Sequence, residues 1–272
     1  MAQLTPLKRT SLTLTLLAAF ATGATLDAAV AQGHTNSTVE WFDTLRDPTV
    51  LSSRASLGYD HTDQHQGAFR NKVSPSGSLA FGAEGQHDWM VSAELPFYHD
   101  YPGNSGGLRE TGVGDLKIGV GHILDGTGRF RWGLGLATTF NTASEPQFGD
   151  GTFQLAPIWG AGYRFSPDFE WVANVQYNAS ATEANGRQPV KSLELKPALI
   201  KILPHHWYSL LGWDSTWDFD NGNLHRGTVK TEFGKGVGSR QQWVFYTGVD
   251  VPVMNAAQDN FTIRAGLNHI FN

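Results

Sequence analysis

Apolar and polar side chains alternate along most of the chain, beginning near residue 53 and continuing to its end. Successive side chains of a strand point to opposite faces, so a period of two is typical of β-strands with one apolar face. Most alternating segments have 10–14 residues, whereas soluble strands average about 5–6 and a tilted membrane-crossing strand needs roughly 9–11. The pattern predicts twelve membrane-crossing strands, at residues 53–61, 76–85, 88–98, 112–124, 130–142, 152–165, 169–181, 191–203, 206–220, 226–238, 242–253 and 260–271.

The predicted strand 169–181 illustrates the two faces. Phe169, Trp171 and Val175 fall on one side, and Glu170 and Asn174 fall on the other. A soluble β-sandwich would show the same alternation, with its apolar face turned inward. Alternation alone therefore does not distinguish a sandwich from a membrane barrel.

The connectors between the predicted strands favour the barrel. Every second connector is short, at residues 86–87, 125–129, 166–168, 204–205 and 239–241. The connectors between these are generally longer, at residues 62–75, 99–111, 143–151, 182–190, 221–225 and 254–259. Short periplasmic turns alternating with longer extracellular loops are typical of outer-membrane barrels, and a sandwich has no reason to follow this rule.

Five tryptophans support the same architecture. Trp89, Trp132, Trp171, Trp207 and Trp243 fall within the first three residues of alternate predicted strands, next to the short turns. Strand starts of this kind share one end of a barrel, so the five indole rings are expected at one depth. Such a ring of aromatic residues is typical of a girdle at the membrane interface.

The C-terminus is also characteristic. The last predicted strand runs to Phe271, one residue before the end. A terminal aromatic residue resembles the outer-membrane assembly signal, from which Asn272 departs because that signal ends on the aromatic residue itself. Together these features predict an all-β fold, a 12-stranded antiparallel transmembrane β-barrel with both termini in the periplasm. Closure removes the unpaired strand edges that lipid does not tolerate.

The N-terminus is typical of a secretory signal peptide. Lys8 and Arg9 provide its positive charge, residues 11–24 form a weakly apolar stretch, and residues 29–31 have the A-x-A pattern of a cleavage site. We therefore expect export to the outer membrane of a Gram-negative bacterium.

Three parts of the chain are predicted from these signals: a signal peptide at 1–31, an N-terminal periplasmic segment or plug at 32–52, and the barrel at 53–272. Trp41, Phe42 and Leu45 could form one face of a short helix in the middle part. The sequence leaves open whether that part is a periplasmic tail or enters the barrel.

The composition fits a membrane sheet with one apolar face. The chain has 31 glycines, 12% aromatic residues, only 17% charged residues and no cysteine. Its net charge of −5 argues against nucleic acid as a partner. The expected partners are outer-membrane lipid and lipopolysaccharide, the outer-membrane assembly machinery and a small-molecule solute. No cofactor is expected.

If the apolar face meets lipid, the opposite face lines the barrel interior. The predicted lining includes Asp60 and Glu84 together with the candidate site residues Glu94, Asp115, Lys117, Arg131, Arg164, Glu170, Glu194, Lys196, Asp214, Asp218, Lys230, Glu232, Asp250 and Arg264. Charges in a water-poor interior should be paired or hydrated. The residues could form a structural ladder of ion pairs or a polar lining that selects solutes, and the sequence allows both.

Two motifs carry a family resemblance. Residues 94–97 read Glu-Leu-Pro-Phe, and residues 112–119 begin Gly-Val-Gly-Asp. A strand that ends in Leu-Pro-aromatic, a loop, and then Gly-x-Gly-Asp with an alternating strand resembles the outer-membrane family named for the MetA pathway of phenol degradation. The resemblance implies a transporter of hydrophobic or aromatic compounds. Asp115 beside Lys117 could be part of a structural turn at the loop–strand junction or could contact substrate.

Three functional classes remain: a channel or transporter, a structural or adhesive barrel with a closed lumen, and a lipid-active enzyme. The outer-membrane phospholipase also has twelve strands, but its His-x-Ser-Asn pattern is absent, and the outward histidines His122 and His269 are predicted near periplasmic strand ends. Residues 218–222 resemble the start of a calcium loop but lack its spacing and distal glutamate. We therefore predict no enzymatic activity and no metal site.

Overall fold

The structure is a computed structural model that describes residues 48–82, 88–103, 108–125, 128–183, 189–220, 222–238, 241–255 and 259–271. All of these belong to the compact unit Gly33–Asn272. The other unit, Met1–Gln32, lies outside the described residues, as do most of the predicted N-terminal segment and Glu84.

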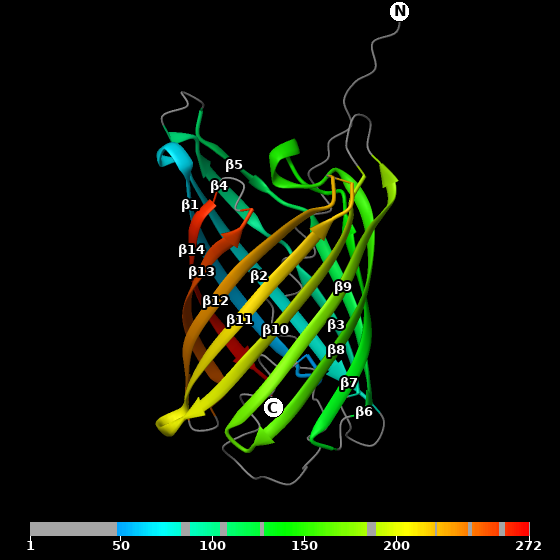
Figure 1. The fold of residues 1–272 in the computed structure, drawn as a ribbon, viewed down its shortest axis with the longest axis vertical. Helices are drawn as coiled ribbons and strands as arrows, with labels where there is room; N and C mark the ends of the chain where they lie inside the picture. The colour runs from blue at the N-terminus through cyan, green and yellow to red at the C-terminus, as the bar shows by residue number, and fades with distance from the viewer. Residues whose placement is uncertain are drawn as a thin grey trace, which may run out of the picture. The chain divides into compact units, whose positions relative to one another are not determined.

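One antiparallel sheet closes on itself to form the barrel of Figure 1. β1 pairs with both β2 and β14, so the first and last strands seal the sheet. Its segments are β1 (Arg54–Gln64), β2 (Phe69–Phe81), β3 (Trp89–Glu94), β4 (Phe97–Tyr101), β5 (Glu110–Val113), β6 (Leu116–Asp125), β7 (Phe130–Phe140), β8 (Thr152–Ser166), β9 (Phe169–Glu183), β10 (Lys191–Leu203), β11 (Trp207–Asp218), β12 (Leu224–Val237), β13 (Trp243–Met254) and β14 (Asp259–Ile270).

Two of the barrel strands are interrupted, which reconciles fourteen segments with the twelve predicted strands. β3 and β4 both pair with β2, one after the other, so they are two halves of one strand. β5 and β6 pair with β4 and β3 in the same way. The predicted 12-stranded antiparallel barrel is confirmed.

The interruptions coincide with the two sequence motifs. Between the paired residues Glu94–Lys117 and Phe97–Val113, the β3–β4 side has two residues and the β5–β6 side has three. The extra residue makes a β-bulge, which bends a strand and redirects its side chains. Pro96 fits on the other side of this irregularity because proline has no backbone N–H to donate.

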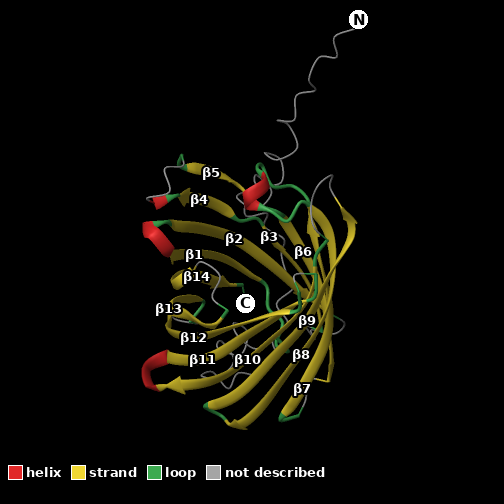
Figure 2. Cartoon of the chain, turned by 45° about the horizontal axis from the view of Figure 1, so that its top comes forward, coloured by secondary structure: helices red, strands yellow, loops and turns green. Residues whose placement is uncertain are grey.

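Large apolar side chains cover the outer face of the sheet. Leu79, Leu134 and Phe245 each expose half of their surface or more, at 64%, 50% and 50%. Figure 2 shows the inclined strands that carry this face around the barrel. An apolar surface of this extent requires lipid around it. No helix in the described part of the chain is both long and apolar enough to span a membrane.

One predicted loop was wrong. Residues 62–75 were expected to connect two strands, but β1 continues to Gln64 and β2 begins at Phe69, with only a short 3-10 turn, His65–Gly67, between them. The stretch 69–75 alternates only in part, because Asn71 interrupts an outward face that carries Phe69 and Val73, and it ends in Pro75, which is typical of a turn. Its pairing with β1 extends the hairpin at the end with the longer loops.

Candidate functional site

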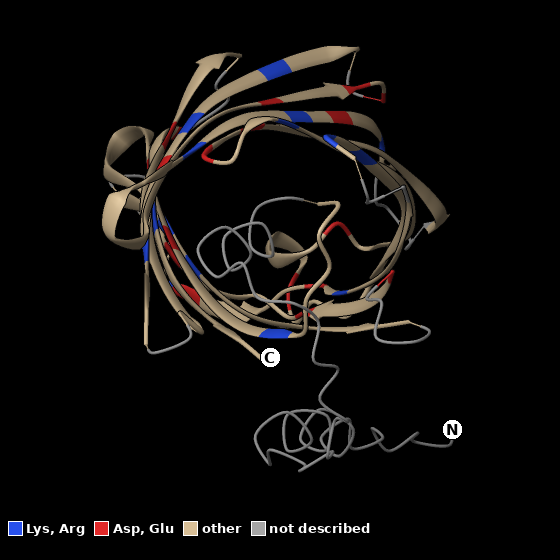
Figure 3. Cartoon of the chain, turned by 90° about the horizontal axis from the view of Figure 1, so that it is seen from below, with Lys and Arg blue, Asp and Glu red and all other residues tan. Residues whose placement is uncertain are grey.

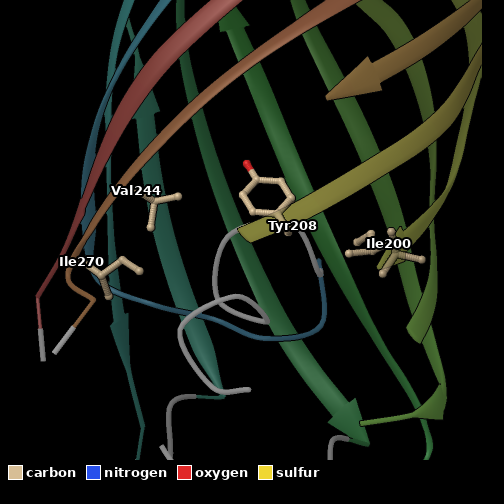
Figure 4. Packing of buried hydrophobic residues seen from close by; sticks show 5 residues of the cluster. Ile200, Tyr208, Val244 and Ile270 are labelled. Carbon is tan, nitrogen blue, oxygen red and sulfur yellow. The ribbon is translucent and has the colours of Figure 1, made fainter. Parts of the chain in front are cut away.

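The inward face of the barrel is identified by its buried apolar cluster. Val172, Ile200, Tyr208, Val244 and Ile270 pack together and expose 4% of their surface or less (Figure 4). Four lie near strand ends beside the short turns, and Ile270, at the end of β14, donates its backbone N–H to Gln242 at the same end. The cluster therefore narrows the interior at that end.

Strand register then assigns the charged candidates to the same inward face. Glu170 precedes Val172 by two positions, Lys196 and Ile200 are four apart, and the paired positions of neighbouring strands continue this face around the barrel. The structure places on it Glu94, Lys117, Arg131, Arg164, Glu170, Glu194, Lys196, Asp214, Asp218, Lys230, Glu232, Asp250 and Arg264. Asp115 lies in the bulge and is buried.

A connected ladder of charges crosses four neighbouring strands, β11 to β14. Lys230 lies 2.6 Å from Asp214 and 3.7 Å from Asp250. Arg264 lies 2.8 Å from Asp250 and 3.1 Å from Glu232. Figure 3 shows such acidic and basic positions side by side on adjacent strands. Each carboxylate has a cation beside it, but three carboxylates share two cations, so pairing compensates the charge of the ladder only in part.

The ladder ends on a hydrogen bond from a tyrosine. Tyr208 donates its hydroxyl to Glu232 over 2.6 Å, and both side chains are buried. This contact joins the charged ladder to the apolar cluster at the short-turn end. Removing one member of such a buried network leaves an uncompensated charge, which costs about 3–5 kcal/mol.

Two smaller groups of ion pairs and hydrogen bonds involve other charged residues on the inward face. Arg131 donates to Glu170, and Arg164 lies 4.0 Å from the second oxygen of the same carboxylate. Lys196 pairs with Glu194, which also accepts a hydrogen bond of 2.8 Å from Asn178. The first group connects β7, β8 and β9, and Asn178 connects β9 to β10, whereas Lys196 and Glu194 belong to the same strand.

Asp115 anchors the loop at 141–151. Its carboxylate accepts hydrogen bonds from the backbone N–H groups of Thr142, Ala143 and Asp150, at 3.0, 2.9 and 2.9 Å. Gly149 is required beside it, because a Cβ at that position would overlap the Asp115 carboxylate. The Gly-x-Gly-Asp motif thus fixes a distant loop against the strand bulge.

That loop enters the barrel interior. Phe148 is buried and stacks on Tyr98, with ring centres 5.5 Å apart and planes 4° apart. A Cβ at Gly112 would overlap Phe148, and a Cβ at Gly114 would come within 2.6 Å of Tyr98. The motif glycines therefore provide the space that this aromatic pair occupies.

Three cavities lie along the interior, with volumes of 310, 370 and 180 Å³. Pro48 and Leu51 line both of the larger ones. Pro48 packs over Gly160, where an added Cβ would lie 3.1 Å from the proline ring. The stretch 48–52 that leads into β1 is thus inside the barrel, between two cavities.

The five girdle candidates all lie on the outer face, at the short-turn end. Trp89 stacks on His122 with ring centres 4.2 Å apart, and Trp243 lies at the same distance from His269. The ammonium group of Lys235 lies 4.9 Å from the ring centre of Trp207. Trp132 and Trp171 occupy the equivalent outward positions near the starts of β7 and β9.

A known protein family matches the region of the chain that contains the two motifs. Residues 78–198, which include both, match the family described as "Putative MetA-pathway of phenol degradation". The predicted family resemblance is confirmed. No curated protein matches the chain.

Solved structures share the architecture. An outer membrane channel from Pseudomonas putida F1 has 10% identity and a TM-score of 0.65, with 81% of this chain and 95% of that chain covered. The NanC porin has 11% identity and a TM-score of 0.56, and the KdgM porin has 12% and 0.53; each comparison covers 80% of this chain and 99% of the other. These matches show that the fold is that of an outer-membrane β-barrel.

The matched structures are channels and porins rather than enzymes. Among the described residues, no group of three or more histidines and carboxylates could hold a metal ion.

Three residues of the inward loop region were not predicted as site residues: Arg70, Tyr98 and Phe148. Arg70 donates three hydrogen bonds to Asp100, of 2.8, 3.1 and 2.5 Å, and one of 3.4 Å to the carbonyl of Gln147 in the inward loop. Arg70 was assigned to a loop, and nothing local marks Phe148 as inward-facing. The paired glycines of the motif were the available signal, since glycine in a strand often marks a close approach.

Proposed function

We propose that the chain is an outer-membrane channel for small solutes, including hydrophobic or aromatic ones. The observation that carries the proposal is a series of interior cavities within a closed barrel, lined by polar side chains and by small residues. The fold shared with known channels and the family description, which refers to phenol degradation, support it. The fourteen charged candidates would be its lumen lining.

The two sides of the interior differ, which suits a channel for solutes of mixed polarity. The charged ladder lies on β11 to β14. The 370 Å³ cavity lies against β6 to β8, where Gly119, Gly121, Gly135, Ala137 and Ile158 line it. Glu94 and Lys117 also line this cavity, so an apolar solute would contact the small residues and leave these two charged groups hydrated.

The placement in the membrane is part of the proposal. The short-turn end, with its five outward tryptophans, would face the periplasm, and the longer loops would face the outside. The signal peptide at 1–31 would direct export, lipid and lipopolysaccharide would surround the barrel, and the assembly machinery would insert it. The segment 32–52 would act as a plug, which the position of Pro48 over Gly160 supports.

A structural barrel with a closed lumen is the second candidate, because the stretch 48–52 and the loop 141–151 both occupy the interior. Planar-bilayer conductance of the full chain separates the two. A channel should give discrete current steps, and vesicles containing it should take up phenol or toluene faster than empty vesicles. Silent bilayers together with unchanged uptake would favour the structural barrel. Fatty-acid release from phospholipid would instead indicate a lipid-active enzyme.

A further inference from the structure

The smallest of these three cavities, of 180 Å³, combines an aromatic pair with a lysine that forms no ion pair with the described residues. It lies between the inward loop and the strand wall and is lined by Arg70, Tyr98, Lys117, Phe148 and Asp150, among others. A buried apolar cavity of about 150 Å³ is large enough to hold benzene. The space is therefore sufficient for one six-membered ring with a small substituent.

The stacked rings of Tyr98 and Phe148 form one side of this cavity. Arg70 caps the stack, with its guanidinium 5.3 Å from the centre of the Tyr98 ring. Planar aromatic faces and edges favour another aromatic ring over a saturated one. This side of the cavity is suited to an aromatic ring.

Lys117 differs from the other inward cations. The structure pairs Arg70 with Asp100, Lys72 with Asp60 and Lys196 with Glu194. Within the described residues, Lys117 has no carboxylate within ion-pair distance, although Glu94 lies directly across from it in the sheet register and Glu194 is close enough to interact with it electrostatically. Arg226 also lacks an ion pair there, but it lines none of the three cavities.

The two carboxylates that line this cavity are already engaged. Asp115 accepts three backbone N–H groups of the loop, and Asp150 accepts a hydrogen bond of 2.7 Å from Gln154. Lys117 is exposed to the interior and lines both this cavity and the 370 Å³ cavity. Its ammonium group is thus available to a solute that passes between the two.

We propose that this cavity binds aromatic carboxylates, with Lys117 pairing with the carboxylate and Tyr98 and Phe148 contacting the ring. A hydrogen bond between an ammonium group and a carboxylate is about twice as strong as one between neutral groups, so the site discriminates against neutral aromatics. This inference rests on the proposed channel function and narrows its solute class.

Benzoate is the probe, applied to the full chain in planar bilayers and, independently, to the detergent-solubilised barrel by calorimetry. Cyclohexanecarboxylate has the charge without an aromatic ring, and benzyl alcohol has the ring without the charge. Benzoate should bind and block the current, and both analogues should bind at least about tenfold more weakly, equivalent to 1.4 kcal/mol.

Lys117→Gln should weaken benzoate binding about tenfold, and Lys196→Gln is the matched control, because it removes the same charge from a different, ion-paired place in the interior. Both variants should shift ion selectivity, but only Lys117→Gln should weaken the block. Phe148→Leu should weaken the binding of benzoate more than it weakens the binding of cyclohexanecarboxylate.

Equal benzoate affinity in Lys117→Gln and the unmodified chain would overturn the proposal, as would equal binding of benzyl alcohol and benzoate. Calorimetry separates this failure from that of the proposed function. Benzoate binding without any conductance would refute the channel and retain the site, whereas conductance without binding would refute the site and retain the channel.

Discussion

Replacing Asp115 by Asn tests whether the family motif holds the inward loop. The variant keeps the size of the side chain but removes its charge and gives it an N–H₂ group in place of one oxygen. In the structure the two oxygens accept three backbone N–H groups, so at least one of these would face a donor instead of an acceptor. The loop should therefore separate from the strand wall more often.

The magnitude follows from the bonds lost. A hydrogen bond to a charged group contributes about 1.5–3 kcal/mol, and Asp115 is only 5% exposed, so water compensates little of the loss. A change of about 2 kcal/mol would shift the balance between docked and undocked loop roughly 30-fold. The barrel itself should stay intact, because its strand ladders do not depend on this carboxylate.

Limited proteolysis within residues 141–151 and single-channel conductance report the loop position. Asp115→Asn should be cleaved faster in intact vesicles and should show larger or noisier current steps, and Gly149→Ala should act in the same direction. Asp168→Asn, in an exposed turn between β8 and β9, is the control. Unchanged cleavage and conductance in Asp115→Asn would show that the loop does not depend on the motif.

Three other predictions concern the walls of the barrel. Arg264→Leu should lower the free energy of unfolding in urea by about 3–5 kcal/mol because Glu232 loses its cation; an unchanged midpoint would contradict a structural ladder. The chain has no cysteine, so introduced cysteines can pair only with each other. The double variant Pro48→Cys and Gly160→Cys should form a disulfide under oxidation, which a non-reducing gel would show. Absence of this disulfide would argue against a stretch 48–52 held inside the barrel. Lipids brominated near the headgroup should quench tryptophan fluorescence more strongly than lipids brominated near the bilayer centre, and this quenching should be weaker in Trp243→Ala. Stronger quenching by lipids brominated near the bilayer centre would refute the girdle.

The strands were accessible from sequence because their signal is local. Residues 191–203 were predicted from alternation, and β10 has the same bounds, Lys191–Leu203. The stretch 69–75 failed because Asn71 interrupts the apolar positions of its outward face and Pro75 is typical of a turn. Backbone pairing with β1 makes this stretch part of β2, and hydrophobicity alone does not reveal that pairing.

The candidate site was only partly accessible. Alternation is enough to place Glu232 and Arg264 on one face, since each side chain follows the pleat of its strand. It does not reveal which charges meet, because this depends on the register between strands. The contact of Phe148 with Tyr98 was inaccessible for the same reason, since it joins a loop to a strand about fifty residues away.

Pairing within the ladder bears directly on which charges can act on a solute. Glu232 and Arg264 satisfy one another, so a passing solute would have to break their contact before it could use either charge. Such groups shape the wall and set its polarity, but they bind weakly to anything that moves past. Lys117 forms no ion pair with any described residue, so it has no such contact to lose. Selectivity in this barrel should therefore depend on the few unpaired charges beside the inward loop more than on the many paired ones.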